Sequence, residues 1–391
     1  MTQHTDPTDW EALPDETFRA RLREWIEAKL PAELRHLNRR ASWIETRPWY
    51  MALSRAGLIA PGWPKQYGGL GLSPGKHLLM IEELERAGTP WMYDAGIRNV
   101  GPVLIAHGTE AQRAAFMPKM LSGEHVWCQG YSEPGAGSDL ASLQTRGKVV
   151  GEELVLNGHK IWTTIASEAT HMFALVRTGE ESRKHDGITF VVLEMAQLGI
   201  RVSPILNLAG HTEFFEVFLE DARTPLSNVI GGLGNGWKVA KAQLGFERIW
   251  AGSPKRAIRA LRRLEQVAEL TGAMRDPAFR DRLTQLRLDV LDTQSLYERC
   301  ADLVRHDGKV SEEISALKIW ATEVFQRVSE AIVEAAGDFG GFAGEVAIGE
   351  DTEVDVLSTL YESRGPTIFA GANEVHRNIL AKRVLGLPEA A

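Results

Sequence analysis

A short segment in the first half of the chain combines residue types that could hold a phosphate-bearing cofactor. Residues 127–139 read Trp-Cys-Gln-Gly-Tyr-Ser-Glu-Pro-Gly-Ala-Gly-Ser-Asp. The two later glycines leave no Cβ in the way of backbone N–H groups that approach a ligand, and Pro134 fixes the turn. Ser132 and Ser138 add hydroxyl donors. An isolated glycine-rich turn is more often an ordinary surface connection, so its meaning depends on the rest of the chain.

A second segment has the pattern of a β-hairpin. Asn157-Gly158 is a preferred two-residue hairpin turn, and the flanking runs 153–156 and 159–164 alternate in the manner of strands. We therefore expect two antiparallel strands joined at Asn157-Gly158. A third segment, residues 361–377, reads Tyr-Glu-Ser-Arg-Gly-Pro-Thr-Ile-Phe-Ala-Gly-Ala-Asn-Glu-Val-His-Arg.

The elements that must position these segments fall into three stretches. Apolar residues recur at helix spacing from Asp15 to about Glu124, and Pro31 stops the first run. The period changes to two from about Val126 to Ile230, which predicts a β domain. Helical spacing returns from Gly236. We therefore divide the α+β chain into a helical domain at 1–125, a β domain at 126–235 and a second helical domain at 236–391.

Two of the later helices carry a regular apolar seam, with residues three and four apart. The seam residues are Leu283, Leu286, Val290, Thr293, Tyr297, Cys300 and Val304 in one helix, and Ile314, Leu317, Ala321, Val324 and Val328 in the other. Such spacing predicts helices packed in a bundle. Cys300 is therefore interpreted as a core residue, because buried cysteine usually behaves as a small hydrophobe.

Composition narrows the class of protein. The 391 residues include 44 Lys and Arg against 52 Asp and Glu, a net charge of -8, which argues against nucleic acid as a partner. Two cysteines in different contexts suggest no disulfide framework, which fits a cytoplasmic protein. The start of the chain lacks a signal-peptide pattern, and no apolar run approaches the ~18 residues of a membrane helix. No metal-ligand spacing occurs among His107, His159, His171 and His211.

Taken together and in order, the three segments resemble the acyl-CoA dehydrogenase family. The matching motifs are a Ser/Thr-Glu-Pro-x-x-Gly-Ser-Asp loop, an Asn-Gly-x-Lys-x-Trp segment and a C-terminal Gly-x-Asn-Glu segment. The resemblance covers nearly the whole chain and implies the same three-part division, with a β-barrel-like middle domain and a C-terminal four-helix bundle. It also implies oxidation of an acyl-CoA thioester to its trans-2-enoyl form with FAD as cofactor.

The resemblance leaves two places for the base that removes the α-proton. Many relatives carry a glutamate just before Gly371, but this chain has Ala370 there. A second branch of the family uses the glutamate of a Glu-Arg pair on the first bundle helix, matched here by Glu247 and Arg248. Glu247 shares a helical stripe with apolar neighbours, where desolvation would raise its pKa, although Arg248 opposes that shift. An ordinary surface pair is the alternative.

The resemblance further marks residues that would bind FAD: Gln129, Tyr131, Ser132, Gly137, Ser138, Trp162, Thr163, Thr164, Gly340, Gly341, Ala372 and Glu374. Substrate contacts would come from Ser138, Arg248 and Gly371. Thr164 falls where a hydroxyl reaches the reactive flavin nitrogen, and Trp162 would pack beside the ring. The alternative for Trp162 is a tryptophan in a strand core. Two departures are Gly337, where the family usually has glutamine, and Ala372, where threonine is common.

The expected partners come from the same resemblance. We expect an electron-transferring flavoprotein as electron acceptor, and a bulky acyl group such as a sterol side chain on the CoA thioester. Many relatives reach a neighbouring subunit's FAD with an Arg-x-x-Phe-Gly loop, but here Asp276 and Pro277 follow Arg275. Arg275 could still serve in this role. Otherwise other groups would hold the neighbour's FAD in a homo-oligomer, a dimer or tetramer, or a homologous partner subunit would supply the arginine. The alternative is a loop change without consequence for assembly. A flavin-dependent oxidase or monooxygenase, and a non-catalytic subunit, remain alternatives.

Overall fold

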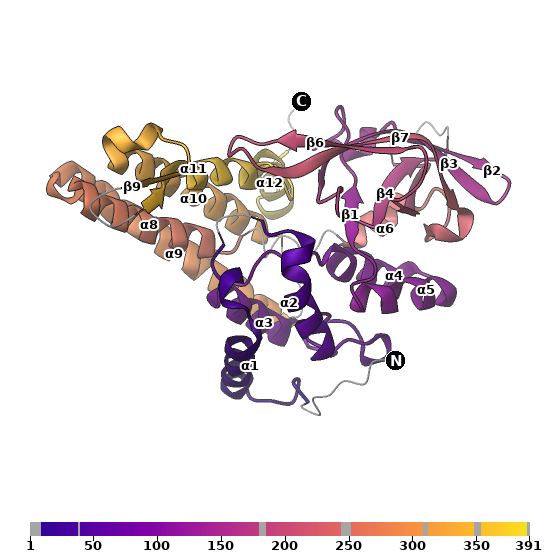
Figure 1. Cartoon of the computed structure of the whole chain (residues 1–391), viewed down its shortest axis with the longest axis horizontal. Helices are drawn as coiled ribbons and strands as arrows, with labels where there is room; N and C mark the ends of the chain where they lie inside the picture. The colour runs from indigo at the N-terminus through magenta and orange to yellow at the C-terminus, as the bar shows by residue number, and fades with distance from the viewer. Residues whose placement is uncertain are drawn as a thin grey trace. The chain divides into compact units, whose positions relative to one another are not determined.

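The computed structural model of the protein describes residues 9–37, 40–179, 185–243, 252–307, 312–347 and 353–388. The chain divides into two compact units, Met1–Leu244 and Gly245–Ala391 (Figure 1). The first unit contains two apolar clusters and the second contains one. Because each unit has its own core, each is described by itself.

The first unit begins with helices, as the apolar spacing predicts. They are α1 (Asp15–Lys29), α2 (Trp43–Arg55), α3 (Pro74–Arg86), a π-helical turn at Gly96–Val100, α4 (Gly101–His107) and α5 (Glu110–Leu121). Phe18, Leu22 and Ile26 of α1 are fully buried and form its inner face, and Trp25 beside them is half-buried. Helix α2 starts at a capping box, in which Ser42 accepts from the N–H of Glu45 and the Glu45 side chain accepts from the N–H of Ser42.

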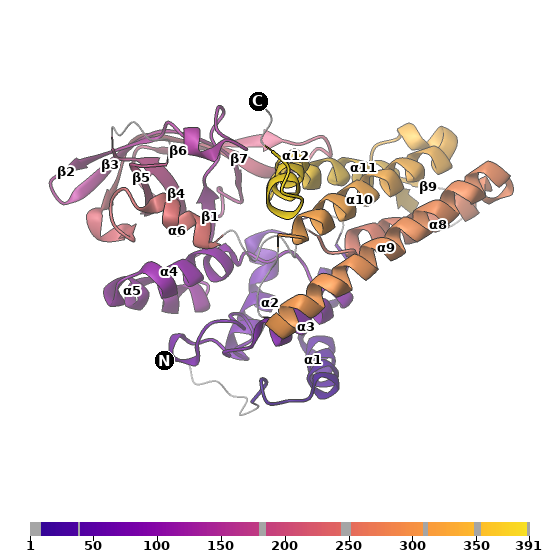
Figure 2. The ribbon, with the colours of Figure 1, turned by 180° about the vertical axis from the view of Figure 1, so that it is seen from behind.

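The second half of this unit is one mixed sheet. Its strands are β1 (Trp127–Gly130), β2 (Arg146–Val150), β3 (Glu153–Thr164), β4 (His171–Arg177), β5 (Ile188–Glu194), β6 (Ile200–Leu206), β7 (Thr212–Pro225) and β8 (Val229–Ile230). They lie in the order β6-β7-β3-β2-β4-β5-β8, with β1 parallel to β4. Strands β4 and β5 are buried almost throughout. Helices α6 (Gly236–Gln243), α4 and α5 lie along one side of the sheet in both ribbon views (Figures 1 and 2).

The predicted hairpin at Asn157-Gly158 is wrong. Both residues lie inside the single strand β3, and the turn that reverses the chain precedes it, between β2 and β3. Pairing with β7 slips between Leu156 and Gly158, which marks a β-bulge. The Asn157 side chain bonds Asp221 of β7, so the amide that would favour a turn stabilises the bulge instead.

The second unit is helical. It contains α8 (Lys255–Thr271), α9 (Pro277–Asp307), α10 (Ile314–Ala336), α11 (Val356–Arg364) and α12 (Asn373–Ile379), with a short ribbon of β9 (Glu345–Ala347) and β10 (Glu353–Asp355). Helix α10 packs against α8, α9, α11 and α12. Every residue of the two predicted seams is buried, Cys300 included, which confirms the helix-bundle prediction. The predicted α+β fold class, with a mixed sheet between two helical parts, is likewise confirmed.

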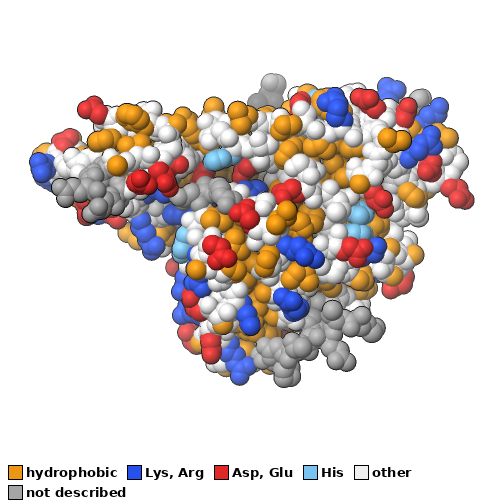
Figure 3. All heavy atoms as spheres, in the orientation of Figure 1, with side chains coloured by type: hydrophobic (Ala, Val, Ile, Leu, Met, Phe, Trp, Pro, Cys, Tyr) orange, Lys and Arg blue, Asp and Glu red, His pale blue; other side chains and the backbone are white. Residues whose placement is uncertain are grey.

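The charged side chains and the two cysteines lie in ordinary environments. Acidic and basic side chains are interspersed on the face shown in Figure 3. Cys128 and Cys300 are both free and buried. Among the residues the structure describes, no helix is long and apolar enough to cross a membrane.

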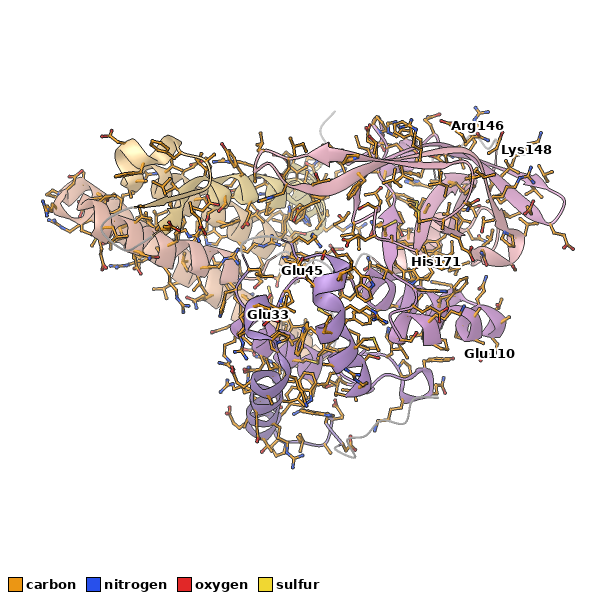
Figure 4. All side chains as sticks on the ribbon, viewed as in Figure 1. Glu33, Glu45, Glu110, Arg146, Lys148 and His171 are labelled. Carbon is orange, nitrogen blue, oxygen red and sulfur yellow. The ribbon has the colours of Figure 1, made fainter. Side chains whose placement is uncertain are left out.

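His125 and His171 pack against each other at the start of the sheet. The ring of His171 of β4, which Figure 4 labels, lies 3.8 Å from that of His125 between centroids, tilted by 30°, and it meets Phe116 of α5 edge-on. Burial lowers the pKa of both His125 and His171 to about 4, so both are neutral near pH 7. No group of acidic, histidine and cysteine side chains in the described part of the chain could hold a metal ion.

Candidate active site

The loop after β1 presents unpaired donors on its outer side. Glu133 and Ala136 exchange two backbone hydrogen bonds, 3.1 and 3.0 Å, that close a tight turn. The N–H groups of Gly135, Gly137 and Ser138 have no partner within the described residues, and all three residues are exposed. Such a row of free N–H groups is a donor set for an anionic oxygen.

The two glycines of this loop are not required by the chain's own packing. Neither Gly135 nor Gly137 has a positive φ, and a Cβ on either would meet nothing within 4 Å. The hydroxyl of exposed Ser138 and that of half-buried Ser132 have no hydrogen-bond partner among the described residues. The open space and the free hydroxyls both fit a ligand that approaches this side of the loop closely.

A buried ion pair fixes the loop to the sheet. Lys160 of β3 is fully buried and donates to Glu133 Oε1 at 2.7 Å and to the Leu175 carbonyl at 2.7 Å. The Glu133 carboxylate also accepts from the backbone N–H groups of Gln144 and Thr145, at 2.5 and 2.9 Å. One carboxylate thus ties together the loop, the strand and the segment that leads to β2.

The electrostatics of this pair reflect burial and mutual attraction. Burial lowers the pKa of Lys160 to about 8, although the charge of Glu133 works against that shift. Burial alone would raise the pKa of Glu133, but the Lys160 charge and the hydrogen-bond donors outweigh burial and lower it below its ordinary value. Both groups are therefore charged at neutral pH, and each offsets part of the cost of burying the other.

A second bulge in β3 turns Trp162 outward. Pairing with β7 slips between Lys160 and Thr163, and Trp162 takes a left-handed φ of 59°. The indole is 57% exposed and meets Phe214 edge-on, with centroids 6.1 Å apart. Trp162 is therefore not a core tryptophan. A bulky residue held at positive φ is strained, and such strain is concentrated at functional sites.

The two threonines after Trp162 differ in environment. Thr163 is fully buried, and its hydroxyl finds no partner among the described residues. Thr164 is half-buried, and its hydroxyl makes no side-chain hydrogen bond within the described residues. The accessible hydroxyl is thus that of Thr164, the residue to which the family resemblance assigns the flavin contact.

The remaining candidates on the first unit contribute in different ways. Tyr131 is 4% exposed, and its ring packs edge-on against Phe173, so its side chain belongs to the core. Its carbonyl accepts from Lys160 at 3.3 Å. Gln129 is half-buried in β1 and accepts from the Asn99 amide at 3.4 Å.

On the second unit, the turn before α12 is held in an unusual conformation. Ala370 and Gly371 have consecutive positive φ values of 53° and 87°. The Gly371 carbonyl accepts from the Lys318 ammonium at 2.6 Å, and the Ala370 carbonyl accepts from His376 Nε2 at 3.1 Å. Lys318 also donates to Asn373 Oδ1 at 2.8 Å.

The other candidates on this unit lie in the turn after α10 and at the start of α12. Gly340 is buried, and a Cβ there would lie 2.6 Å from the Val333 carbonyl oxygen, so this glycine is needed for packing. Gly341 is exposed, with nothing within 4 Å of an added Cβ. Ala372 is the residue before α12, and Glu374 is exposed in the first turn of that helix. Glu247 and Arg248, the predicted base and its neighbour, lie outside the described residues.

Comparison with known proteins decides the family. Models of three acyl-CoA dehydrogenase domains match the chain: the N-terminal domain over 14–124, the middle domain over 128–222 and the C-terminal domain over 234–385. The chain belongs to the acyl-CoA dehydrogenase family. It is therefore an oxidoreductase of the flavoprotein type, as the ordered motifs predict.

Relatives of this acyl-CoA dehydrogenase match along nearly its whole length. It is 37% identical over 389 residues to acyl-CoA dehydrogenase IpdE1 of Mycobacterium tuberculosis, covering 96% of this chain and 98% of the relative. A solved structure described as the Tcur3481-Tcur3483 steroid ACAD superposes with a TM-score of 0.85 at 31% identity, over 96% of this chain and 98% of that one. The ChsE4-ChsE5 complex from Mycobacterium tuberculosis gives a TM-score of 0.80 at 27% identity, over 96% and 98%.

Sequence reasoning missed the groups that hold the site of this acyl-CoA dehydrogenase in shape. Glu133 lies in the first loop, and Lys160, Lys318 and His376 hold the candidate loops from the protein side. Glu133, Lys160 and His376 fall inside the three segments that carry the resemblance, but the resemblance gave none of the four a role. A signal was present for Lys318, which lies one residue after Leu317 on the predicted apolar seam of α10. A lysine on a core face requires a buried partner, because burying an unpaired ammonium is costly.

Proposed function

We propose that this acyl-CoA dehydrogenase binds FAD and converts an acyl-CoA thioester to the trans-2-enoyl-CoA, with Glu247 as the base that removes the α-proton. A bound flavin supplies the acceptor for the β-hydride. Ser132, Ser138 and the free N–H groups near Gly137 would bind and orient the cofactor. Thr164 would donate its hydroxyl to the reactive edge of the ring, and Trp162 would cover the ring.

One observation carries the cofactor assignment. The bulge in β3 exposes a large aromatic side chain at a strained φ, next to an accessible threonine hydroxyl and a loop of unpaired N–H donors. A flat ring that carries a phosphate-bearing tail needs these three kinds of contact: an apolar face, a donor at the ring edge and donors for the phosphates.

The base assignment rests on a missing carboxylate. Ala370 is exposed in the turn where many relatives carry a glutamate, and it has no group that could accept a proton. The nearest carboxylate in sequence, Glu374, lies on the exposed side of α12. Glu247 on the first bundle helix then remains as the candidate that the family resemblance supplies.

The test uses the purified holoprotein under anaerobic conditions with a panel of acyl-CoAs. We expect a thioester to bleach the flavin, and Glu247→Gln to slow the bleaching by ~10²–10⁴-fold while FAD stays bound, because general-base catalysis contributes about that much. Bleaching at the wild-type rate in the variant would show that Glu247 is not the base. Steady oxygen consumption with substrate would favour the oxidase alternative.

The finer proposals concern substrate and partners. Two of the matching solved structures are described by paired names, one as a steroid ACAD and one as a complex. Arg275 is exposed in the turn between α8 and α9, followed by Asp276 and Pro277 rather than by the usual loop. These observations support a bulky, ring-bearing acyl group and an oligomer that includes a homologous subunit. We further propose a cytoplasmic location and an electron-transferring flavoprotein as acceptor.

A further inference from the structure

Helix α10 carries a fully buried lysine beside its apolar seam, where a charged side chain does not contribute to apolar packing. Lys318 lies on the same helical stripe as Ile314 and Ala321, and none of its side chain is exposed. Taking an ammonium out of water costs several kcal/mol unless its protons are bonded. Leucine or methionine would continue the seam without that cost. The amine is therefore explained by what it bonds, the carbonyl of Gly371 and the side chain of Asn373.

A buried histidine holds the neighbouring carbonyl of the same turn. His376 is 2% exposed, with Nε2 at 3.1 Å from the Ala370 carbonyl and Nδ1 at 3.0 Å from the Ser315 hydroxyl. Since a carbonyl oxygen only accepts, Nε2 carries the proton, and Nδ1 accepts from Ser315; this tautomer is assigned from the partners. Both carbonyls of the strained turn are thus held from the protein side.

Because the peptide bond is planar, the direction of these two carbonyls also fixes the direction of the N–H groups that follow them. In a trans peptide the C=O of one residue and the N–H of the next point in opposite directions. Because the carbonyls of Ala370 and Gly371 point inward to His376 and Lys318, the N–H groups of Gly371 and Ala372 point outward. Neither N–H donates a hydrogen bond within the part of the chain that the structure describes.

We propose that Lys318 and His376 are positioning residues that hold the turn so that the N–H groups of Gly371 and Ala372 face a bound ligand oxygen. The inference rests on the proposed function, in which that oxygen belongs to the flavin phosphates or to the acyl thioester. The bond from the ammonium also polarises the peptide between Gly371 and Ala372, which strengthens its N–H as a donor. In the absence of these two side chains, the strain of Ala370 at positive φ would favour relaxation of the turn.

The test compares Lys318→Met with Thr322→Val. Methionine keeps the length and burial of the side chain but removes its charge and donors. The Thr322 hydroxyl bonds Asn373 in the same network and does not touch the turn carbonyls, so Thr322→Val controls for general loosening. Hydrogen–deuterium exchange is followed in a peptide that spans residues 369–373, in the protein without ligand, with FAD alone, and with FAD and an acyl-CoA.

In wild type and Thr322→Val we expect ligand to slow exchange in this peptide at least ~10-fold, the effect of one well-formed hydrogen bond. In folded Lys318→Met the slowing should be lost. Loss of the FAD-induced protection, with weaker FAD binding, assigns the oxygen to the cofactor. Loss of only the acyl-CoA-induced protection, with a lower kcat at similar KM, assigns it to the thioester.

Two outcomes overturn the proposal. One is wild-type protection and kinetics in Lys318→Met, and the other is a wild-type turn that no ligand protects although FAD binds and thioester is oxidised. If Lys318→Met does not fold, His376→Phe provides the second variant, because it keeps a buried ring and removes the Nε2 donor to Ala370. Failure of the proposed function would appear differently, as wild-type protein that neither binds FAD nor oxidises any thioester.

Discussion

At the scale of single residues, the candidate site is marked by polar groups that have no hydrogen-bond partner among the described residues. The hydroxyl of Thr164 is accessible and has no side-chain partner among the described residues, whereas that of Thr163 is sealed in the sheet. The family resemblance names both threonines and gives the contact with the reactive flavin nitrogen to Thr164. What it does not give is their burial, because the bulge before Thr163 shifts the alternation of the strand. The accessible hydroxyl of Thr164 agrees with that assignment.

Replacing Thr164 by valine tests this assignment. The change keeps the shape of the side chain and removes the donor, so the flavin midpoint potential or the rate of flavin reduction should change. Thermal stability of the apoprotein should change little, since no hydrogen bond within the described chain is lost. Thr163→Val is the matched control, because its buried hydroxyl already lacks a partner. Equal potentials and reduction rates in wild type and Thr164→Val would show that the hydroxyl does not face the ring.

A glycine of the loop gives a second residue-scale prediction. An added Cβ at Gly137 meets nothing in the chain and requires no positive φ, so Gly137→Ala should leave the melting temperature of the apoprotein within about 1 °C of wild type, as surface substitutions usually do. If a ligand lies against this backbone, FAD affinity should fall ~10-fold or more. Isothermal titration with FAD measures it. Wild-type affinity in Gly137→Ala would place the cofactor elsewhere.

At the scale of elements, local pattern and tertiary pairing disagree in one instructive place. Asn157-Gly158 has the composition of a hairpin turn, yet the strand continues through it. A Cβ on Gly158 would lie 2.4 Å from the Thr145 hydroxyl oxygen, so the glycine is needed for close approach rather than for turning. The helices and their seams were predictable because burial follows one periodicity over many residues. The bulges were not, because they depend on what β7 places opposite.

The helices of the first unit are joined by a buried carboxylate. Glu83 of α3 is 1% exposed and accepts from Arg19 and Arg23 of α1 and from Arg86, at distances of 2.7 to 2.8 Å. Burial alone would raise its pKa, but the hydrogen bonds from the three guanidinium groups lower it to about 2. The carboxylate is ionised at neutral pH and anchors α1 on α3.

The pH dependence of this anchor follows from the sign of the shift. A folded-state pKa of about 2, below the ordinary 4.5, gives stability that is complete above about pH 4.5 and is lost as the pH falls toward 2. Glu83→Gln should destabilise the protein by a few kcal/mol at pH 7, and the difference from wild type should shrink below pH 4.5. Urea unfolding across that range measures it. Glu110→Gln, at an exposed pair, is the control (Figure 4); a pH-independent difference for Glu83→Gln would contradict the account.

At the scale of the whole molecule, the motifs predict some features and only the folded structure shows others. The family motifs predict the order of domains, the cofactor and the reaction, because those motifs are local. The common role of two buried lysines was not predicted. In each unit one lysine donates to a backbone carbonyl of the candidate loop, Lys160 in the sheet and Lys318 in the helical bundle. Their partners are distant in sequence, so only the folded chain brings them together.

Assembly is the prediction that belongs to this scale. If a homologous subunit supplies the interface arginine in place of Arg275, the chain purified alone should carry well under one FAD per polypeptide. Coexpression with a homologous subunit should bring occupancy close to one per completed site. Gel filtration with flavin absorbance measures both. Full occupancy and acyl-CoA turnover by the chain alone would rule out the need for a heteromer and favour the homo-oligomer.

The outward bulge at Trp162 also makes the protein its own optical probe. Among the tryptophans that the structure describes, Trp162 and Trp91 are exposed, with 57% and 46% of their surface accessible to solvent. Aqueous iodide should therefore quench a part of the apoprotein's fluorescence that Trp162→Phe removes, while Trp91→Phe removes a separate part. If a ring system covers the Trp162 indole on FAD binding, the first part becomes inaccessible to iodide and the second does not. A stopped-flow trace of that difference would report cofactor docking at one residue without any label.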